Sequence, residues 1–233
     1  MKICVISDIH GSILWEAIVD REYENVDRFI FLGDYMDDKY QQSSPSQQVE
    51  NLEHIVEFKE EFQSVDLLIG NHDLQYVGGV RCAPYYDFMT YALSKGYLTS
   101  LITKGILQAI AQYDNYLFSH AGLSSIWMKE KGIDNVLDIN PRFKASPLLI
   151  DFVEKSDSNS RGENNYQSPI WIRHISLAES AHGNYIQVIG HTQFESKIEI
   201  VHDNNRKFIL TDTGMTQYLI VDTESEKETI LDI

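Results

Sequence analysis

The chain has 233 residues, of which 43% are hydrophobic and 11% aromatic, so it is long and apolar enough for one sizeable core, and we expect a single domain over residues 1–233. Its 35 acidic residues against 19 Lys and Arg give a formal net charge of −16, which excludes a nucleic-acid duplex or an anionic membrane as a partner over most of the surface. Cys4 and Cys82 indicate neither a disulfide framework nor a metal-binding motif, and no apolar run approaches the length of a transmembrane helix, so we expect a soluble protein of the cytoplasm.

Short apolar runs that end in polar residues recur in the first third of the chain. Residues 2–7, 27–32 and 65–69 have the pattern of buried strands, and apolar residues at helical spacing follow the first and second runs, over 13–23 and 49–62, with Ser46 as the cap of the second helix. Strands that alternate with helices predict a parallel α/β sheet, in which ligands bind at the carboxyl ends of the strands. The polar side chains at those ends are Asp8, His10, Asp34, Asp37, Asn71 and His72.

The middle of the chain is less regular. Residues 83–95 predict an aromatic helix, residues 96–112 are ambiguous between helix and strand, and the apolar run 116–119 leads to His120. The polar stretch 157–165 predicts a loop or lid. Strand-like runs at 185–189, 197–201, 207–211, 218–222 and 228–231 follow at meander spacing, so we expect a second sheet packed on the first, within an α/β fold.

The polar residues after the strands have the chemistry of a metal site. Asp8 and His10 lie two apart in extended backbone, so their side chains point to the same side and can bind one cation together. A lone Asp-x-His is a weak signal, and a histidine after a strand is more often packed or hydrogen-bonded than a ligand. Oxygen and imidazole donors that recur at the ends of five apolar runs nevertheless predict a metal centre, with His120 and His191 as further members.

The order of these motifs resembles the calcineurin-like metallophosphoesterase superfamily, from Asp8 to about Gly214. The resemblance implies a four-layer α-β-β-α sandwich and two divalent metal ions, manganese by preference, with iron or zinc as alternatives. It also implies that Asp34 bridges the two ions, that His72 is the catalytic histidine beside them, and that Asp37 orients His72. The implied ligands are Asp8, His10 and Asp34 for the first metal and Asp34, Asn71, His120 and His191 for the second.

Elementary chemistry agrees with such a centre. Two divalent ions about 3.5–4 Å apart hold a phosphoryl group and lower the pKa of a water to that of a nucleophilic hydroxide near neutral pH. Only Asp8 and Asp34 among the implied ligands are charged, so the centre keeps a local charge of about +2 that attracts phosphate to an acidic protein. A protonated His72 would then protonate the departing alkoxide, a role worth about 10²–10⁴ in rate.

One detail favours a branch of the superfamily. Residues 190–193 read Gly-His-Thr-Gln in place of the Gly-His-x-His of another large group, which resembles the bacterial phosphoprotein phosphatase and symmetrical diadenosine tetraphosphatase branch. Asp38 and Lys39 stand where that branch has Arg-Gly, so the arginine that grips substrate phosphate is missing, and Lys39, Arg173 and Arg161 are the candidates to replace it.

The resemblance leaves three functions open. The preferred function is a serine/threonine phosphatase-like phosphomonoesterase acting on phosphorylated proteins or peptides. The alternative is a dinucleoside polyphosphate hydrolase, which performs the same chemistry on a nucleotide substrate. A metal- or nucleotide-binding module without turnover is the third.

Overall fold

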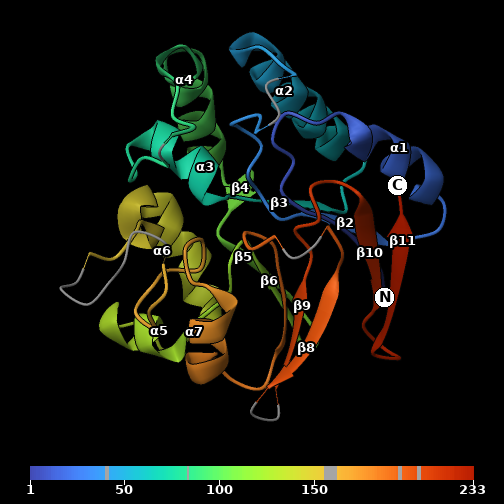
Figure 1. The fold of residues 1–233 in the computed structure, drawn as a ribbon, viewed down its shortest axis with the longest axis vertical. Helices are drawn as coiled ribbons and strands as arrows, with labels where there is room; N and C mark the ends of the chain where they lie inside the picture. Colours follow the sequence, from blue (N-terminus) through green and yellow to red (C-terminus); the bar gives the residue numbers. More distant parts are fainter. Residues whose placement is uncertain (40–41, 83, 155–161, 194–195, 204–205) are drawn as a thin grey trace.

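The computed structural model describes residues 1–39, 42–82, 84–154, 162–193, 196–203 and 206–233. Two β-sheets stack between helices, which gives the expected four-layer arrangement (Figure 1). The first sheet has the strand order β11-β10-β1-β2-β3-β4 and the second β5-β6-β7-β9-β8. The bounds are β1 (Lys2–Ile6), β2 (Arg28–Phe31), β3 (Val65–Leu68), β4 (Leu107–Gln108), β5 (Ile110–Tyr113), β6 (Tyr116–Ser119), β7 (Ile186–Ile189), β8 (Glu199–Asp203), β9 (Arg206–Leu210), β10 (Gln217–Asp222) and β11 (Lys227–Asp232).

Parallel strands lie at the centre of both sheets. In the first sheet β1, β2 and β3 pair in parallel, as the alternation of strands and helices predicts, and in the second sheet β6, β7 and β9 do the same. Each of these central strands therefore delivers the residues that follow it to the same edge of its sheet.

The last third of the chain differs from the expected second-sheet meander. Strands β7, β8 and β9 join β5 and β6, but β10 and β11 return to the first sheet, where Leu219 of β10 lies opposite Val5 of β1 in an antiparallel pair. Leu219 and Val221 then point into the space between the sheets, where they pack with Ile3 and Val5. Alternating apolar residues predict strands but do not identify the sheet that they join.

The helices are α1 (Leu14–Glu22), α2 (Pro45–Glu61), α3 (Asn71–Leu74), α4 (Phe88–Lys104), α5 (Ser125–Glu130), α6 (Ile139–Ala145) and α7 (His174–Ser180), with short 3-10 turns at Gln75–Val77, Val136–Asp138 and Pro147–Ile150. Ser44, and not Ser46, caps α2 through a reciprocal pair of bonds with Gln47. Helix α4 begins at Phe88, five residues later than the aromatic pattern predicts, because Asp87 caps it. The ambiguous stretch 96–112 divides into the end of α4 and the strands β4 and β5.

Residues 3–6 of β1 are all buried, and their side chains alternate between two cores, which explains the layers. Ile3 and Val5 belong to the core between the two sheets, whereas Cys4 and Ile6 face the helices that cover the first sheet. A smaller core joins α7 to the outer face of the second sheet through Leu177. Among the described residues, no helix is long and apolar enough to cross a membrane. Residues 157–161 of the predicted loop or lid lie outside the described residues.

Candidate metal centre

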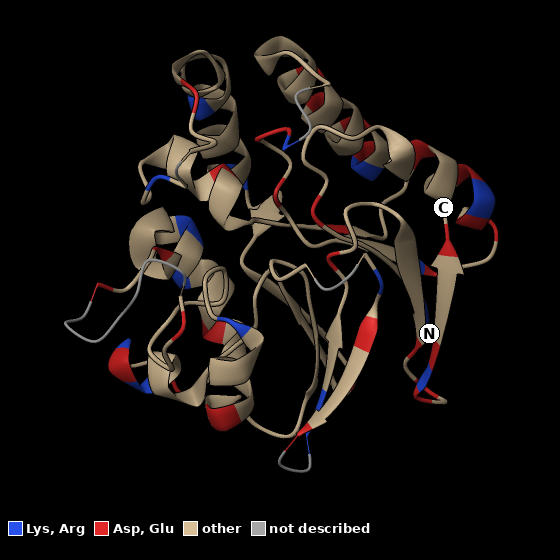
Figure 2. Ribbon diagram, in the orientation of Figure 1, with Lys and Arg blue, Asp and Glu red and all other residues tan. Residues whose placement is uncertain are grey.

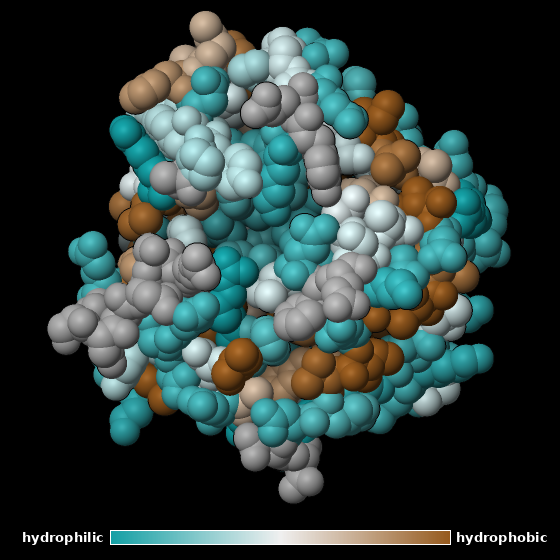
Figure 3. Space-filling model, viewed as in Figure 1, coloured by the Kyte–Doolittle hydropathy of each residue, from teal (hydrophilic) through white to brown (hydrophobic). Residues whose placement is uncertain are grey.

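The predicted polar residues lie together where the carboxyl ends of the parallel strands from both sheets meet. Figure 2 shows acidic residues on the loops above these strand ends, and Figure 3 shows a hollow with a hydrophilic floor on the same face. All of the predicted metal-site residues in this cluster are buried. They are Asp8 and His10 after β1, Asp34 and Asp37 after β2, Asn71 and His72 at the start of α3, His120 after β6, and His191 after β7.

The backbone at Asp8 and His10 is left-handed and not extended, so the expected reason for their side chains pointing to the same side was wrong. Asp8, His10, Asp34, Asp37 and His191 have positive φ angles of 51°, 45°, 55°, 64° and 65°. Left-handed backbone is unfavourable for residues with a side chain and occurs mostly where the surroundings enforce it, often at functional sites. Five of the nine such non-glycine residues that the described chain contains belong to this one cluster.

Two glycines allow the carboxylates to approach the neighbouring loops closely. A Cβ atom on Gly190 would overlap the Asp8 Oδ2 atom and the Ser7 hydroxyl, and a Cβ atom on Gly70 would overlap the Asp34 carboxylate. The glycines in the Gly-His and Gly-Asn pairs therefore have a steric role, because any side chain there would displace a candidate ligand.

The donor atoms converge on the Asp34 carboxylate and the Asn71 amide oxygen. Asp8, Asp34 and His120 each offer one ligand atom, and the three atoms lie within 4.8 Å of one another. The Asp34 Oδ2 atom is 3.3 Å from His120 Nε2 and 3.6 Å from His10 Nε2. The Asn71 Oδ1 atom is 2.9 Å from both His120 Nε2 and His191 Nδ1. Asp34 thus lies between two groups of donors.

Hydrogen bonds to backbone carbonyls fix the tautomers of two of the histidines. His120 Nδ1 lies 2.9 Å from the carbonyl oxygen of Leu32, and His10 Nδ1 lies 3.0 Å from that of Met36. A carbonyl only accepts, so each Nδ1 carries a proton, and each Nε2 turns a lone pair toward Asp34 whenever its ring is neutral.

Neutral rings held in this way bring acceptors face to face. His120 Nε2 would confront the oxygen of Asn71, and the Nε2 atoms of His10 and His191 are buried without a hydrogen-bond partner in the described part of the chain. Acceptors and orphaned imidazole nitrogens around one carboxylate fit a divalent cation, for which oxygen and imidazole are suitable donors.

The pKa values reflect the same arrangement. Burial lowers the pKa of His120, but the charge of Asp34 more than compensates and raises this pKa to about 9. Burial raises the pKa of Asp34, yet His120 and His72 bring it well below its usual value. Burial alone dominates for His10, whose pKa falls to about 3. A proton on His120 therefore balances Asp34 in the metal-free protein, and cation binding would displace it.

A second group of contacts holds His72 beside the cluster. The Asp37 carboxylate lies 2.7 Å from His72 Nδ1 and also accepts hydrogen bonds from the Gln75 amide and the Tyr76 hydroxyl. Burial raises the pKa of Asp37, whereas His72 and Tyr76 lower it, leaving it above the ordinary value. The His72 backbone N–H donates to the Asp34 carboxylate at 2.9 Å. His72 is therefore tied both to its acid and to the metal cluster.

Two of the three basic candidates for phosphate binding lie at this site. Lys39 faces Asp8 and Asp212, whose charges overcome its burial and raise its pKa. Arg173 is partly buried beside His191 and donates to the His191 carbonyl at 3.0 Å and to the Thr192 hydroxyl at 3.1 Å. Arg161 lies outside the described residues.

Two supporting residues had no role in the sequence analysis. Asp73 is fully buried and accepts backbone N–H groups from both Gly70 and the loop that carries Asp34. An acid three residues after Gly70, at the start of a helix, is the available signal for this role. Cys82 accepts a hydrogen bond from the Asn71 amide nitrogen at 3.1 Å, which turns the amide oxygen toward His120, and no pattern in the sequence indicates this contact.

A buried group of carboxylate, amide and imidazole donors at the strand ends of an α-β-β-α sandwich is suited to bind divalent metal ions. Residues 1–216 match the calcineurin-like phosphoesterases, and the chain belongs to this family of metal-dependent phosphoester hydrolases. A comparison with curated proteins finds no significant match.

Solved structures with similar folds include other phosphoesterases. A metallophosphoesterase from Sphaerobacter thermophilus is 16% identical with a TM-score of 0.59, and the match covers 100% of this chain and 88% of that one. A protein serine/threonine phosphatase from Saccharomyces cerevisiae is 13% identical with a TM-score of 0.55, covering 100% and 80%. A putative diadenosine tetraphosphatase is 14% identical with a TM-score of 0.51, covering 99% and 93%. At these identities the similarity establishes the sandwich fold alone.

Proposed function

We propose that residues 1–233 form one metallophosphoesterase domain with a dinuclear centre that hydrolyses phosphate monoesters, in the manner of serine/threonine protein phosphatases. The observation that carries the proposal is the position of Asp34. One of its carboxylate oxygens lies 3.6 Å from a nitrogen of His10 and 3.3 Å from a nitrogen of His120, so the same oxygen faces both groups of donors. The bound metals are expected to be manganese, with iron or zinc as alternatives.

The donors divide into two sets around that carboxylate. Divalent cations bound there would polarise the phosphoryl oxygens and acidify a water for attack on phosphorus. The first set contains two carboxylates and one imidazole, and the second adds two imidazoles and an amide to the shared carboxylate. The first set is Asp8, His10 and Asp34, and the second is Asp34, Asn71, His120 and His191.

His72 would serve as the general acid. Asp37 accepts from its Nδ1 atom, so a protonated His72 keeps its Nε2–H for the oxygen of the leaving group. The Gln75 amide and the Tyr76 hydroxyl hold the Asp37 carboxylate in place, which fixes the direction of the His72 ring. Asp37 is thus a positioning residue for His72.

Lys39 and Arg173 would bind the substrate phosphate in place of the arginine that relatives carry after the acid matching Asp37. Lys39 faces the first set of donors, and Arg173 lies beside His191 in the second. The charges of Asp8, Asp212 and Asp34 act on both cations, so both lie near the centre, and each would contact a phosphate bound there. Their positive charge also offsets an acidic surface that repels anions.

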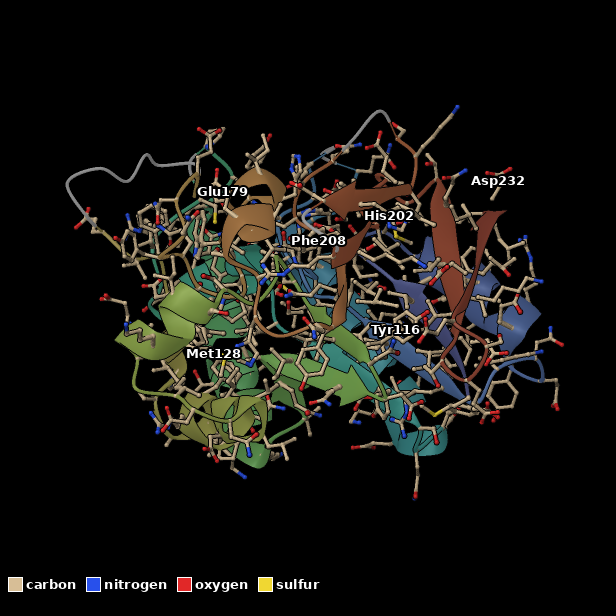
Figure 4. The ribbon with its side chains drawn as sticks, turned by 90° about the horizontal axis from the view of Figure 1, so that it is seen from below. Tyr116, Met128, Glu179, His202, Phe208 and Asp232 are labelled. Carbon is tan, nitrogen blue, oxygen red and sulfur yellow. The ribbon has the colours of Figure 1, made fainter. Side chains whose placement is uncertain are left out.

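Two cavities favour a second candidate, the hydrolysis of dinucleoside polyphosphates. A cavity of about 650 Å³ beside Asp8 and a cavity of about 790 Å³ beside Arg173 share Gln193 in their linings. Glu179 of α7 (Figure 4) lines the second cavity. A substrate with a bulky group on each side of its phosphates would fill both cavities. A phosphorylated protein or peptide would occupy only one of the two cavities, with the segment that carries the phosphate. Hydrolysis of phosphorylated proteins or peptides remains the function that we prefer.

We further propose that the protein works in the cytoplasm, because both cysteines are free and buried, as in proteins of a reducing compartment. The function is tested by measuring turnover of phosphoserine and phosphothreonine peptides, p-nitrophenyl phosphate and diadenosine tetraphosphate with Mn²⁺. Faster turnover of the phosphopeptides supports the preferred function, and much faster turnover of the dinucleotide favours the second candidate. Wild-type protein that binds metal and turns over none of them would refute a phosphoesterase.

A further inference from the structure

Asp212 is a buried acid beside the metal centre, and it has no role in the proposed reaction. It follows β9, lines the cavity of about 650 Å³ together with Asp8 and His10, and exposes only 3% of its surface. Its Oδ1 atom accepts a hydrogen bond from the Gly214 backbone N–H at 3.2 Å. Its Oδ2 atom is buried and has no hydrogen-bond partner within the described residues.

Burying a carboxylate oxygen without a hydrogen-bond partner costs folding free energy. Buried charges in proteins are normally paired, hydrogen-bonded or bound to a metal. Burial and the neighbouring charge of Asp8 raise the pKa of Asp212 to about 7, and the charge of Lys39 only partly offsets them. Asp8 and Asp212 line one cavity with His10, whose Nε2 atom also lacks a hydrogen-bond partner among the described atoms.

The two proposed sets of donors are unequal. The second set has four side chains, whereas the first has Asp8, His10 and Asp34 alone, and the chain has Gln193 where other members of the superfamily place a further histidine on the first metal. Divalent cations such as Mn²⁺ favour additional carboxylate oxygens in their surroundings. Asp212 lines the cavity on the side of the smaller set.

We infer that Asp212 belongs to the first metal site and that its Oδ2 atom strengthens the binding of a divalent cation there. The inference rests on the proposed dinuclear centre. It adds a third carboxylate to the first site, so the charge of the loaded centre falls to about +1 before Lys39 is counted. Metal binding relieves the repulsion that Asp212 and Asp8 exert on each other, which gives this acid a reason to be buried.

The test measures Mn²⁺ binding by calorimetry and by electron paramagnetic resonance at fixed pH in wild type and Asp212→Asn. We expect wild type to bind two Mn²⁺ ions per chain, more weakly at the first site than at the second. In Asp212→Asn the affinity of the first site should fall about 10- to 100-fold, while the affinity of the second site changes little. Asp38→Asn removes the same charge from the same cavity, but Asp38 already accepts hydrogen bonds from Ser43, so we expect a loss of less than about threefold. Asp20→Asn, on the exposed face of α1, should match wild type.

Other results would overturn the inference. Wild-type affinity at both sites in Asp212→Asn, or a loss equal to that of Asp38→Asn, would show that Oδ2 does not serve the metal. Unchanged Mn²⁺ affinity with weaker inhibition by inorganic phosphate would show that Asp212 acts on Lys39 instead. The metal-free variant should be at least as resistant to urea as wild type at pH 8, because an uncompensated charge is removed, and lower resistance would indicate a structural role. Fewer than two ions in wild type would instead refute the dinuclear centre itself.

Discussion

Replacing Asp73 by Asn should destabilise the metal-free protein by about 3 kcal/mol, because two buried N–H groups would lose their acceptor. One oxygen of Asp73 accepts from Gly70 and Asp34 at 2.9 and 2.8 Å, and the other accepts from Tyr35 and Met36 at 2.8 and 3.1 Å. A carboxamide keeps one of these oxygens and turns an NH₂ group toward the other pair of donors. Two unpaired buried N–H groups at roughly 1–2 kcal/mol each give the magnitude.

Urea unfolding followed by tryptophan fluorescence measures this change. Asp87→Asn is the matched control, since Asp87 caps α4 and Asn caps a helix as well as Asp does, so its effect should stay within about 0.5 kcal/mol. The affinity for Mn²⁺ should fall in Asp73→Asn as well, because the released loop carries Asp34. A free energy of unfolding for Asp73→Asn equal to that of Asp87→Asn would refute the role assigned to Asp73.

Three further predictions concern the site itself. His72→Asn should lower kcat by about 10²–10⁴ while both metals remain bound. His202→Asn, on the exposed edge strand β8 (Figure 4), is the control and should leave kcat unchanged. Loss of metal in the His72 variant would show that the role of His72 is misassigned. Lys39→Met should raise the KM for phosphopeptide about tenfold with unchanged metal content, and an unchanged KM would remove Lys39 from phosphate binding. Burial lowers the pKa of His10 to about 3, so its neutral ring contributes stability above pH 6.5 that is lost as the pH falls toward 3. The free energy of unfolding of the metal-free protein should therefore fall between pH 7 and pH 4 by about 3 kcal/mol more in wild type than in His10→Asn, as measured by urea titration. An equal fall in both proteins would contradict the lowered pKa.

Much of the site can be predicted from the sequence because the signal is local: polar residues directly follow short apolar runs. Asp8 and Asp34 each end an apolar run, and parallel strands bring the ends of such runs to one edge. The pairing of β10 with β1 has no such signal, since it joins Val5 to Leu219 across most of the chain. Alternation tells which face of a strand is buried but not which sheet covers it.

The start of α2 could have been predicted correctly from the sequence, whereas the contacts that support the site could not. Ser44 caps α2 through Gln47, with Pro45 at the first helical position, a pattern that was visible in the sequence and that Ser46 does not share. The roles of Asp73 and Cys82 depend on which backbone N–H or side-chain amide approaches them, and those approaches are made only after the loops have assembled.

The central claim is that Asp34 is shared by two metal ions. A crystal structure of the Mn²⁺-loaded protein, with anomalous scattering measured at the manganese edge, tests this claim most directly. Our account predicts two anomalous peaks about 3.5–4 Å apart, one beside His10 and one beside His120, with the Asp34 carboxylate between them. A single peak, or two peaks of which only one contacts Asp34, would contradict it.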